Sequence, residues 1–181
     1  MNNGKKCSLF CILSILASLL SACGGRKTYT MAGDYLVYDT AKALVDASDV
    51  IFSGKVMNIR YEMLDVRTEP GVDSMTGSEE TERLPYTLYE IEIMETYKGE
   101  YESNRIVLKR PGGIFDDATY KVADATEILQ NEQYLFLAEE FSDSYPSLLN
   151  PTQASYHLKE AGISSNEEAI TLNQILEILE E

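Results

Sequence analysis

The feature that most restricts the fold is a strict alternation of apolar and acidic residues within residues 86–97. Tyr89, Ile91 and Ile93 occupy every second position, and a glutamate follows each of the first two. A period of two places alternate side chains on opposite faces of a β-strand, whereas a helix of this sequence would scatter its apolar residues around the axis. This segment therefore predicts a strand with one buried face.

A second long strand is predicted over residues 50–63, with a change of face near Gly54. Val50, Phe52 and Val56 share one parity, but the apolar residues after position 56 take the other parity. A shift by one residue is typical of a β-bulge, and glycine permits the backbone to bend there. The residues predicted to point into a closed sheet are Phe52, Val56, Tyr89, Ile91, Ile93 and Phe136.

Three further segments have strand character. Residues 105–109 are apolar in the middle and are followed by a Pro-Gly-Gly turn, so they are expected to pair with residues 86–97 as a hairpin. Residues 134–138 form an uninterrupted apolar run, as expected for a strand buried on both faces. Residues 155–159 give a weaker signal. At least five strands are expected.

Two short helices are predicted at the ends of this strand-rich region. In residues 39–48, apolar positions recur at helical spacing, and Asp39 is placed to cap the first turn. Near the C-terminus, Thr171 and Gln174 have the spacing of a capping box before an apolar stripe. The fold class predicted is mainly β with short helices (α+β).

The N-terminus has the pattern of an export signal. Lys5 and Lys6 precede an apolar run of 13 residues, 8–20. A membrane-spanning helix needs about 20 apolar residues, so a cleavable signal peptide over residues 1–22 is favoured over an uncleaved anchor.

The run ends in Leu20-Ser21-Ala22-Cys23, which resembles the lipobox of bacterial lipoproteins at all four positions. The resemblance implies cleavage before Cys23, a lipid on its thiol, and attachment to the extracytoplasmic face of a cell membrane or envelope. An ordinary secretory peptide with a chance cysteine is the alternative. The other two cysteines lie in the segment to be removed, so a mature chain would have no thiol left for a disulfide or a cysteine metal site. Residues 23–34 lack a period and are expected to form a tether.

The order of strands and turns between residues 48 and 137 is similar to that of netrin-type modules and tissue inhibitors of metalloproteinases. The similarity rests on residues 48–56, on 86–99 with its Tyr97-Lys98-Gly99 ending, on 106–108 and on 132–137. It implies a five-stranded OB-like β-barrel, here as one domain over residues 35–181. Those proteins are stapled by disulfides, and the inhibitors bind zinc through a free N-terminal cysteine. An acylated Cys23 could not do so, and metalloproteinase inhibition by that route is not expected.

Charge excludes one large class of function. The chain carries −15, and because residues 1–22 contain two lysines and no carboxylate, the remainder carries −17. Nucleic-acid binding needs lysine and arginine to displace counterions from phosphates, so a nucleic-acid partner is not expected. Such a surface instead favours a protein partner with a basic surface.

Catalytic signatures are absent from the sequence. His157 is the single histidine, and neither a nucleophile-elbow nor a zinc-protease motif occurs. Carboxylate clusters lack the spacing of a calcium-binding loop and are expected to be solvated. These clusters are Asp116-Asp117 with Asp124, Glu79-Glu80 with Glu82, and Glu139-Glu140 with Asp143. No catalytic residue, cofactor or metal is expected.

The expected function is a lipid-anchored binding or scaffold protein without catalysis. The alternatives are an inhibitor or immunity-type lipoprotein that blocks a partner enzyme, and a carboxylate-dependent hydrolase of envelope polymers. Any partner surface is expected around the long connections 65–84 and 112–124, which are either functional or tolerated insertions. Tyrosines could present rings to a ligand, although strand propensity also explains them; they are Tyr86, Tyr89, Tyr97, Tyr101 and Tyr134.

Overall fold

The computed structural model describes residues 26–31, 33–65, 71–72, 79–80, 83–101, 103–160 and 170–180. The predicted signal peptide 1–22, the predicted lipidation site Cys23 and most of connection 65–84 lie outside this part. Among the described residues, no helix has the length and apolarity needed to cross a bilayer. The main strands are β2 (Val50–Asp65), β5 (Arg83–Lys98), β6 (Arg105–Pro111), β9 (Gln133–Glu139), β10 (Ser147–Leu148) and β11 (Ser155–His157).

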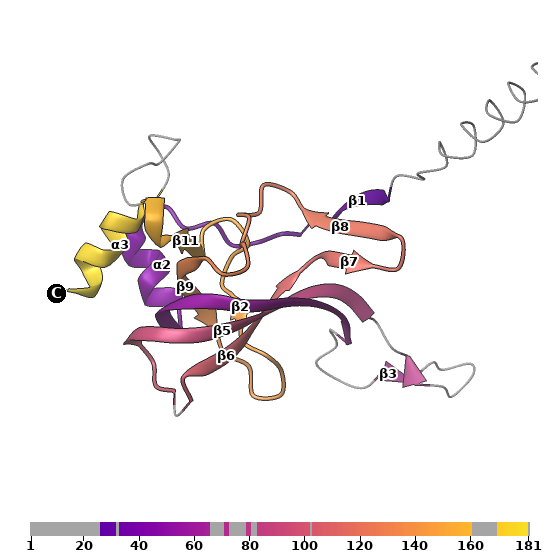
Figure 1. Cartoon of the computed structure of the whole chain (residues 1–181), viewed down its shortest axis with the longest axis horizontal. Helices are drawn as coiled ribbons and strands as arrows, with labels where there is room; N and C mark the ends of the chain where they lie inside the picture. The colour runs from indigo at the N-terminus through magenta and orange to yellow at the C-terminus, as the bar shows by residue number, and fades with distance from the viewer. Residues whose placement is uncertain are drawn as a thin grey trace, which may run out of the picture.

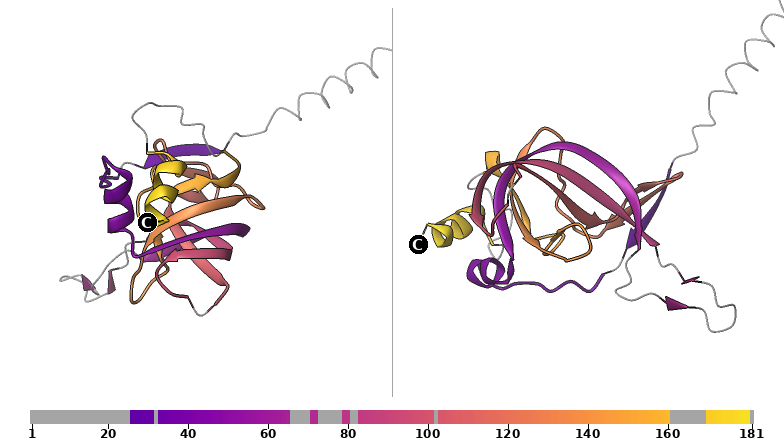
Figure 2. Two further views of the ribbon diagram at one scale, coloured as in Figure 1. Left: turned by 90° about the vertical axis from the view of Figure 1, so that its left-hand side faces the viewer. Right: turned by 90° about the horizontal axis from the view of Figure 1, so that it is seen from below.

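Five of these strands close into a barrel, in the order β6, β5, β2, β9, β10 and back to β6. β10 closes the ring because it pairs antiparallel with β9 and parallel with β6, at Ser147 opposite Lys109. β11 pairs with residues 134–136 of β9, next to the residues that pair with β10. The second view in Figure 2 shows the long strands β2 and β5 curving around the interior. The predicted α+β class with an OB-like barrel is confirmed.

The change of face in the first long strand is also confirmed. The pairing of β2 with β5 shifts register between Ser53 and Gly54 and again between Val56 and Asn58. A Cβ on Gly54 would lie 2.5 Å from Cγ2 of Ile91, so only glycine allows β5 to approach this closely. The bend lets β2 form part of the barrel wall and then continue beyond it as a two-stranded ribbon with β5.

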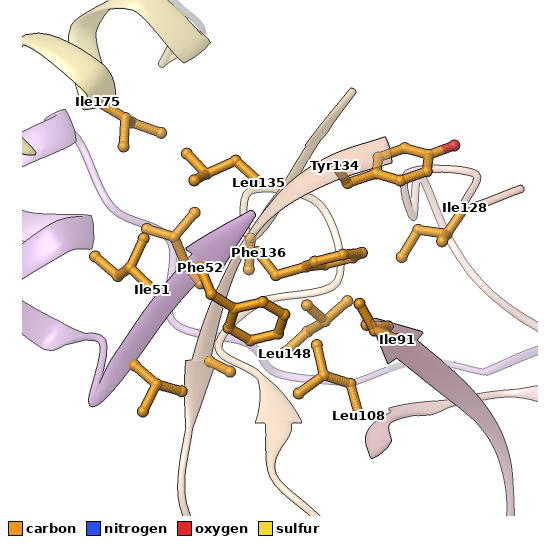
Figure 3. Packing of buried hydrophobic residues seen from close by; sticks show 14 of the residues in the cluster. Ile51, Phe52, Ile91, Leu108, Ile128, Tyr134, Leu135, Phe136, Leu148 and Ile175 are labelled. Carbon is orange, nitrogen blue, oxygen red and sulfur yellow. The ribbon is translucent and has the colours of Figure 1, made fainter. Parts of the chain in front are cut away.

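Apolar side chains from all sides of the barrel meet in one core (Figure 3). The rings of Phe52 and Phe136 lie 5.5 Å apart, and Ile91 is 1% exposed. Ile93 is only half-buried; it pairs with Gly54 at the register shift and is the first residue of β5 beyond its pairing with β6. Of the residues predicted inside, the fully buried ones are Phe52, Val56, Tyr89, Ile91 and Phe136.

Both predicted helices are present and pack side by side, at the end of the barrel opposite strands β7 and β8 (Figure 1). They are α2 (Ala41–Ala47) and α3 (Leu172–Leu179). The Thr171–Gln174 capping box forms as predicted. The prediction that Asp39 caps α2 is wrong: the Thr40 hydroxyl accepts the hydrogen bond from the Ala43 amide, because it directly precedes the first turn.

A second, smaller sheet was not predicted. β7 (Gly113–Phe115) and β8 (Ala118–Val122) form a hairpin within the expected loop 112–124, and β1 (Lys27–Met31) adds to it in parallel. Lys27–Met31 is therefore a strand, not part of a structureless tether. The remaining short elements are the paired β3 (Gly71–Val72) and β4 (Glu79–Glu80) and a 3-10 turn at Leu158–Glu160.

Candidate binding cavity

Two rows of side chains mark the change from packed core to open cavity on the inner face of the barrel wall. Leu108, Tyr89 and Ile59 lie opposite one another on β6, β5 and β2, and the first two are buried. Two residues farther along the strands, the corresponding row is Arg110, Thr87 and Tyr61. Tyr61 is 42% exposed, so the barrel interior opens to solvent at this row.

The hairpin β7–β8 and residues 125–128 cover this opening and leave a cavity of about 490 Å³. This volume lies within the range of about 300–1,000 Å³ that is usual for small-molecule sites. The lining combines apolar rings and aliphatic groups with hydroxyls and charges. Its members are Ile59, Tyr61, Thr87, Tyr89, Arg110, Gly112, Gly113, Ile114, Thr119, Tyr120, Lys121, Val122, Ala125, Thr126, Glu127 and Ile128.

Glycines at the end of β6 allow the hairpin to lie over the cavity. Gly112 has φ of +91°, and a Cβ there would lie 2.8 Å from the carbonyl oxygen of Tyr120. The Thr87 hydroxyl donates to the Gly112 carbonyl at 2.8 Å, and the Gly112 amide donates to the Pro85 carbonyl, also at 2.8 Å. The chain therefore turns directly from β6 into β7 while staying bonded to β5.

Arg110 joins the barrel wall to the covering segment. Its guanidinium lies 5.4 Å from the centre of the Tyr89 ring and donates to the carbonyl oxygen of Thr126. Within the described residues it makes no ion pair with a carboxylate. A guanidinium has five N–H donors in a planar fork that matches carboxylate and phosphate oxygens, so donors remain for a ligand.

The environment of Tyr89 keeps its hydroxyl protonated. Burial raises the pKa of this phenol above its usual 10.0, and nearby Tyr61 raises it further, whereas the Arg110 charge and a hydrogen bond with Thr87 lower it by less. At neutral pH the side chain is an uncharged ring with a polar end, suited to an apolar ligand that carries a polar group.

Local charge at the cavity differs from that of the whole chain. Arg110 and Lys121 line it against one carboxylate, Glu127, in a chain that carries −15 overall. The cavity is thus a cationic spot in an acidic protein, and electrostatics favour an anionic group there.

The other residues considered from the sequence lie elsewhere. His157 is on β11, edge-on to the Tyr134 ring at 4.9 Å, with Nε2 3.3 Å from Glu132. Lys159 binds the same carboxylate. These contacts place His157 beside the Glu132–Lys159 ion pair, away from the cavity lining.

The carboxylate clusters do not gather around a common point in the described part of the chain, where no three acidic, histidine or cysteine residues are placed to hold a metal. Asp116 and Asp124 instead occupy turn positions with φ of 49° and 55°. The side chains of Glu79, Glu80 and Glu82 lie outside the described part.

Of the tyrosines named from the sequence, Tyr89 lines the cavity. Tyr134 is buried in the core, the Tyr101 hydroxyl donates to Glu140 at 3.0 Å, and Tyr86 lies 6.0 Å from the Lys109 ammonium. Sequence reasoning missed Tyr61, Tyr120 and Arg110. The parity change after Gly54 could have placed Tyr61 inside, but Arg110 became a candidate only once its pairing with Thr87 was known.

Comparison with models of known protein families and comparison with curated proteins both gave no match to this chain.

Proposed function

We propose that this protein is an exported, lipid-anchored binding protein that acts without catalysis and holds a small ligand in the cavity under the β7–β8 hairpin. The observation that carries this proposal is the cavity lining, in which an Arg110 guanidinium that pairs with no carboxylate among the described residues lies over the ring of Tyr89 and shares the lining with Tyr61. The ligand class that fits has an apolar body and one anionic group.

The anchor is the lipid on Cys23 inferred from the lipobox. One lipid chain holds a protein only marginally and two or more hold it stably, because each buried methylene adds about 0.8 kcal/mol. The mature protein would then face the outside of the cell membrane or lie within the cell envelope.

A thermal-shift comparison tests the ligand class. The mature domain is incubated with decanoate or phenylacetate, and separately with the uncharged amides of the same two acids. Saturation of a site to 100 times its Kd stabilises the fold by about 2.7 kcal/mol. We expect at least one acid to raise Tm more than its amide does.

Two variants make the comparison specific. Arg110→Met keeps the stem that packs on Tyr89 but removes the donors, so it should abolish the shift relative to the variant's own Tm. Tyr145→Ala removes a ring that is about as exposed as that of Tyr61 but lies against Arg60, outside the cavity lining. It should leave the shift in Tm unchanged. A shift that survives Arg110→Met, or acids and amides that act equally, would contradict the proposal.

A second candidate is the inhibitor or immunity-type role, in which the acidic connection 65–84 meets a basic surface on a partner protein. This connection holds six carboxylates and two arginines. Its ends are paired at Asp65 and Arg83, on the same side of the barrel as the cavity. Replacing it with a Gly-Ser bridge should weaken binding to such a partner and reduce the salt dependence of that binding, while leaving Tm unchanged. His157→Ala should alter neither the binding nor Tm.

A further inference from the structure

We propose that the end of the small sheet formed by the β7–β8 hairpin and the start of β1 lies on the bilayer that holds the Cys23 lipid, with Phe115 in the membrane interface. This inference rests on the proposed lipid anchor, and it assigns a docking surface that the anchor alone does not specify.

Chain length provides the first argument. Lys27, the first residue of β1, is four residues after Cys23, and four extended residues span at most about 14 Å. The polar headgroup region adds only roughly 5–8 Å on each side of a bilayer. Lys27 therefore cannot lie far above the headgroups.

Strand pairing then brings the hairpin to the same level. The Lys27 amide donates to the Asp117 carbonyl at 3.2 Å, and Lys27 pairs with Ala118 at the start of β8. Because β1 is parallel to β8, its first residue lies at the turn of the β7–β8 hairpin (Figure 1). A lipid that restrains Lys27 restrains this turn as well.

The turn carries the side chain that an interface favours. Phe115 is 38% exposed at the end of β7, immediately before the turn. Apolar aromatic rings gain free energy on leaving water at a bilayer surface. The stacked rings of Tyr29 and Tyr120, 5.4 Å apart, lie two residues farther along their strands and could reach the headgroup level.

Charge distinguishes this end from the opposite one. Residues 26–31 and 113–122 contain Arg26, Lys27 and Lys121 against Asp116 and Asp117, whereas the chain after residue 22 carries −17. The opposite end presents α3, with Glu177 and Glu180 (Figure 1). An anionic membrane surface attracts basic groups and repels acidic ones, so it favours the small sheet over α3 and over the acidic connection 65–84, which lies on the same side of the barrel as the sheet.

This docking also places the cavity near the membrane. Ile114 and residues 119–122 of the same hairpin line it, and Ile114 directly precedes Phe115. A ligand with an apolar body and an anionic group would then be available from the bilayer surface itself.

Site-specific quenching tests the docking. The full chain is produced with its lipid and placed in vesicles of phosphatidylethanolamine and phosphatidylglycerol at 3:1, with a spin label on a fraction of the headgroups. A fluorophore is attached at Asp117→Cys or, as a matched exposed acidic position on α3, at Glu177→Cys. Headgroup proximity should make quenching at position 117 about threefold stronger than at position 177.

A second pair of variants tests the role of the aromatic ring. In the Asp117→Cys background, Phe115→Ser should reduce quenching by about half, whereas Phe141→Ser, a similarly exposed phenylalanine between β9 and β10, should not. Equal quenching at positions 117 and 177, or quenching that is unchanged by Phe115→Ser, overturns the docking while leaving the anchor intact. Failure of both labelled proteins to float with the vesicles overturns the anchor and the docking together.

Discussion

At the scale of single residues, burial decides which side chains are essential to the fold. Ile91 is 1% exposed and lies between Ile106 and Val56 on the neighbouring strands. Nearby Met94 on the same strand is 55% exposed. The two positions therefore form a matched pair within one element.

Ile91→Ala should lower the free energy of unfolding by about 2–5 kcal/mol, because it removes buried methyl and methylene groups and leaves a cavity. Met94→Ala should change it by less than about 0.5 kcal/mol. Denaturant unfolding of both variants gives these values. An Ile91→Ala domain that melts within a degree of the parent would show that the register described here is wrong.

Tyr89 links stability to pH. Burial raises the pKa of its phenol, so the folded state favours the neutral form. The contribution of Tyr89 to the free energy of unfolding is therefore complete below pH 10, where the phenol is also neutral in the unfolded state. It is lost as pH rises through the pKa of the folded state. The ultraviolet titration curve of Tyr89→Phe is subtracted from that of the parent. The difference should show one phenol that ionises above pH 10. Ionisation at or below pH 10 would contradict the buried position.

At the scale of elements, the sequence predicted those with long periodic patterns. The strand over 86–97, the shift at Gly54 and the capping box at Thr171 all have local causes that a single segment contains. β7, β8 and β1 have three to five residues each, too few to establish a period, and they form only because they pair with one another. The cavity was missed for the same reason, since it lies between the barrel wall and this small sheet.

Gly112→Ala should detach the hairpin that covers the cavity. A non-glycine residue at φ of +91° costs about 1–3 kcal/mol, and the added Cβ would also press on the Tyr120 carbonyl. Hydrogen exchange should accelerate at residues 113–122 while residues 133–139 keep their protection. Thr119→Ala, a change in the same hairpin, should leave both segments unaffected. Unchanged exchange in Gly112→Ala would mean that the hairpin does not depend on this turn.

At the scale of the whole molecule, the acidic charge and the cationic cavity have separate consequences. The charge of −17 after residue 22 is a property of composition and was evident from the sequence. The local surplus of positive charge at the cavity, from Arg110 and Lys121, was not evident from the sequence. These two residues are 11 positions apart and both line the cavity only when β8 folds back over β6. A protein partner of the acidic surface should associate more slowly as salt rises, whereas a ligand enclosed in the cavity should respond less.

The principal claim, on which both the location of the protein and the membrane docking depend, is the lipid on Cys23. Phase separation in detergent, with mass spectrometry of the N-terminal peptide, tests it for the parent and for Cys23→Ala produced in a bacterial host. The parent should lose residues 1–22, carry the mass of a lipid on Cys23 and enter the detergent phase. Cys23→Ala should either retain its signal or be released into the aqueous phase. A Cys23→Ala protein that has lost its signal completely and still enters the detergent phase would contradict the account.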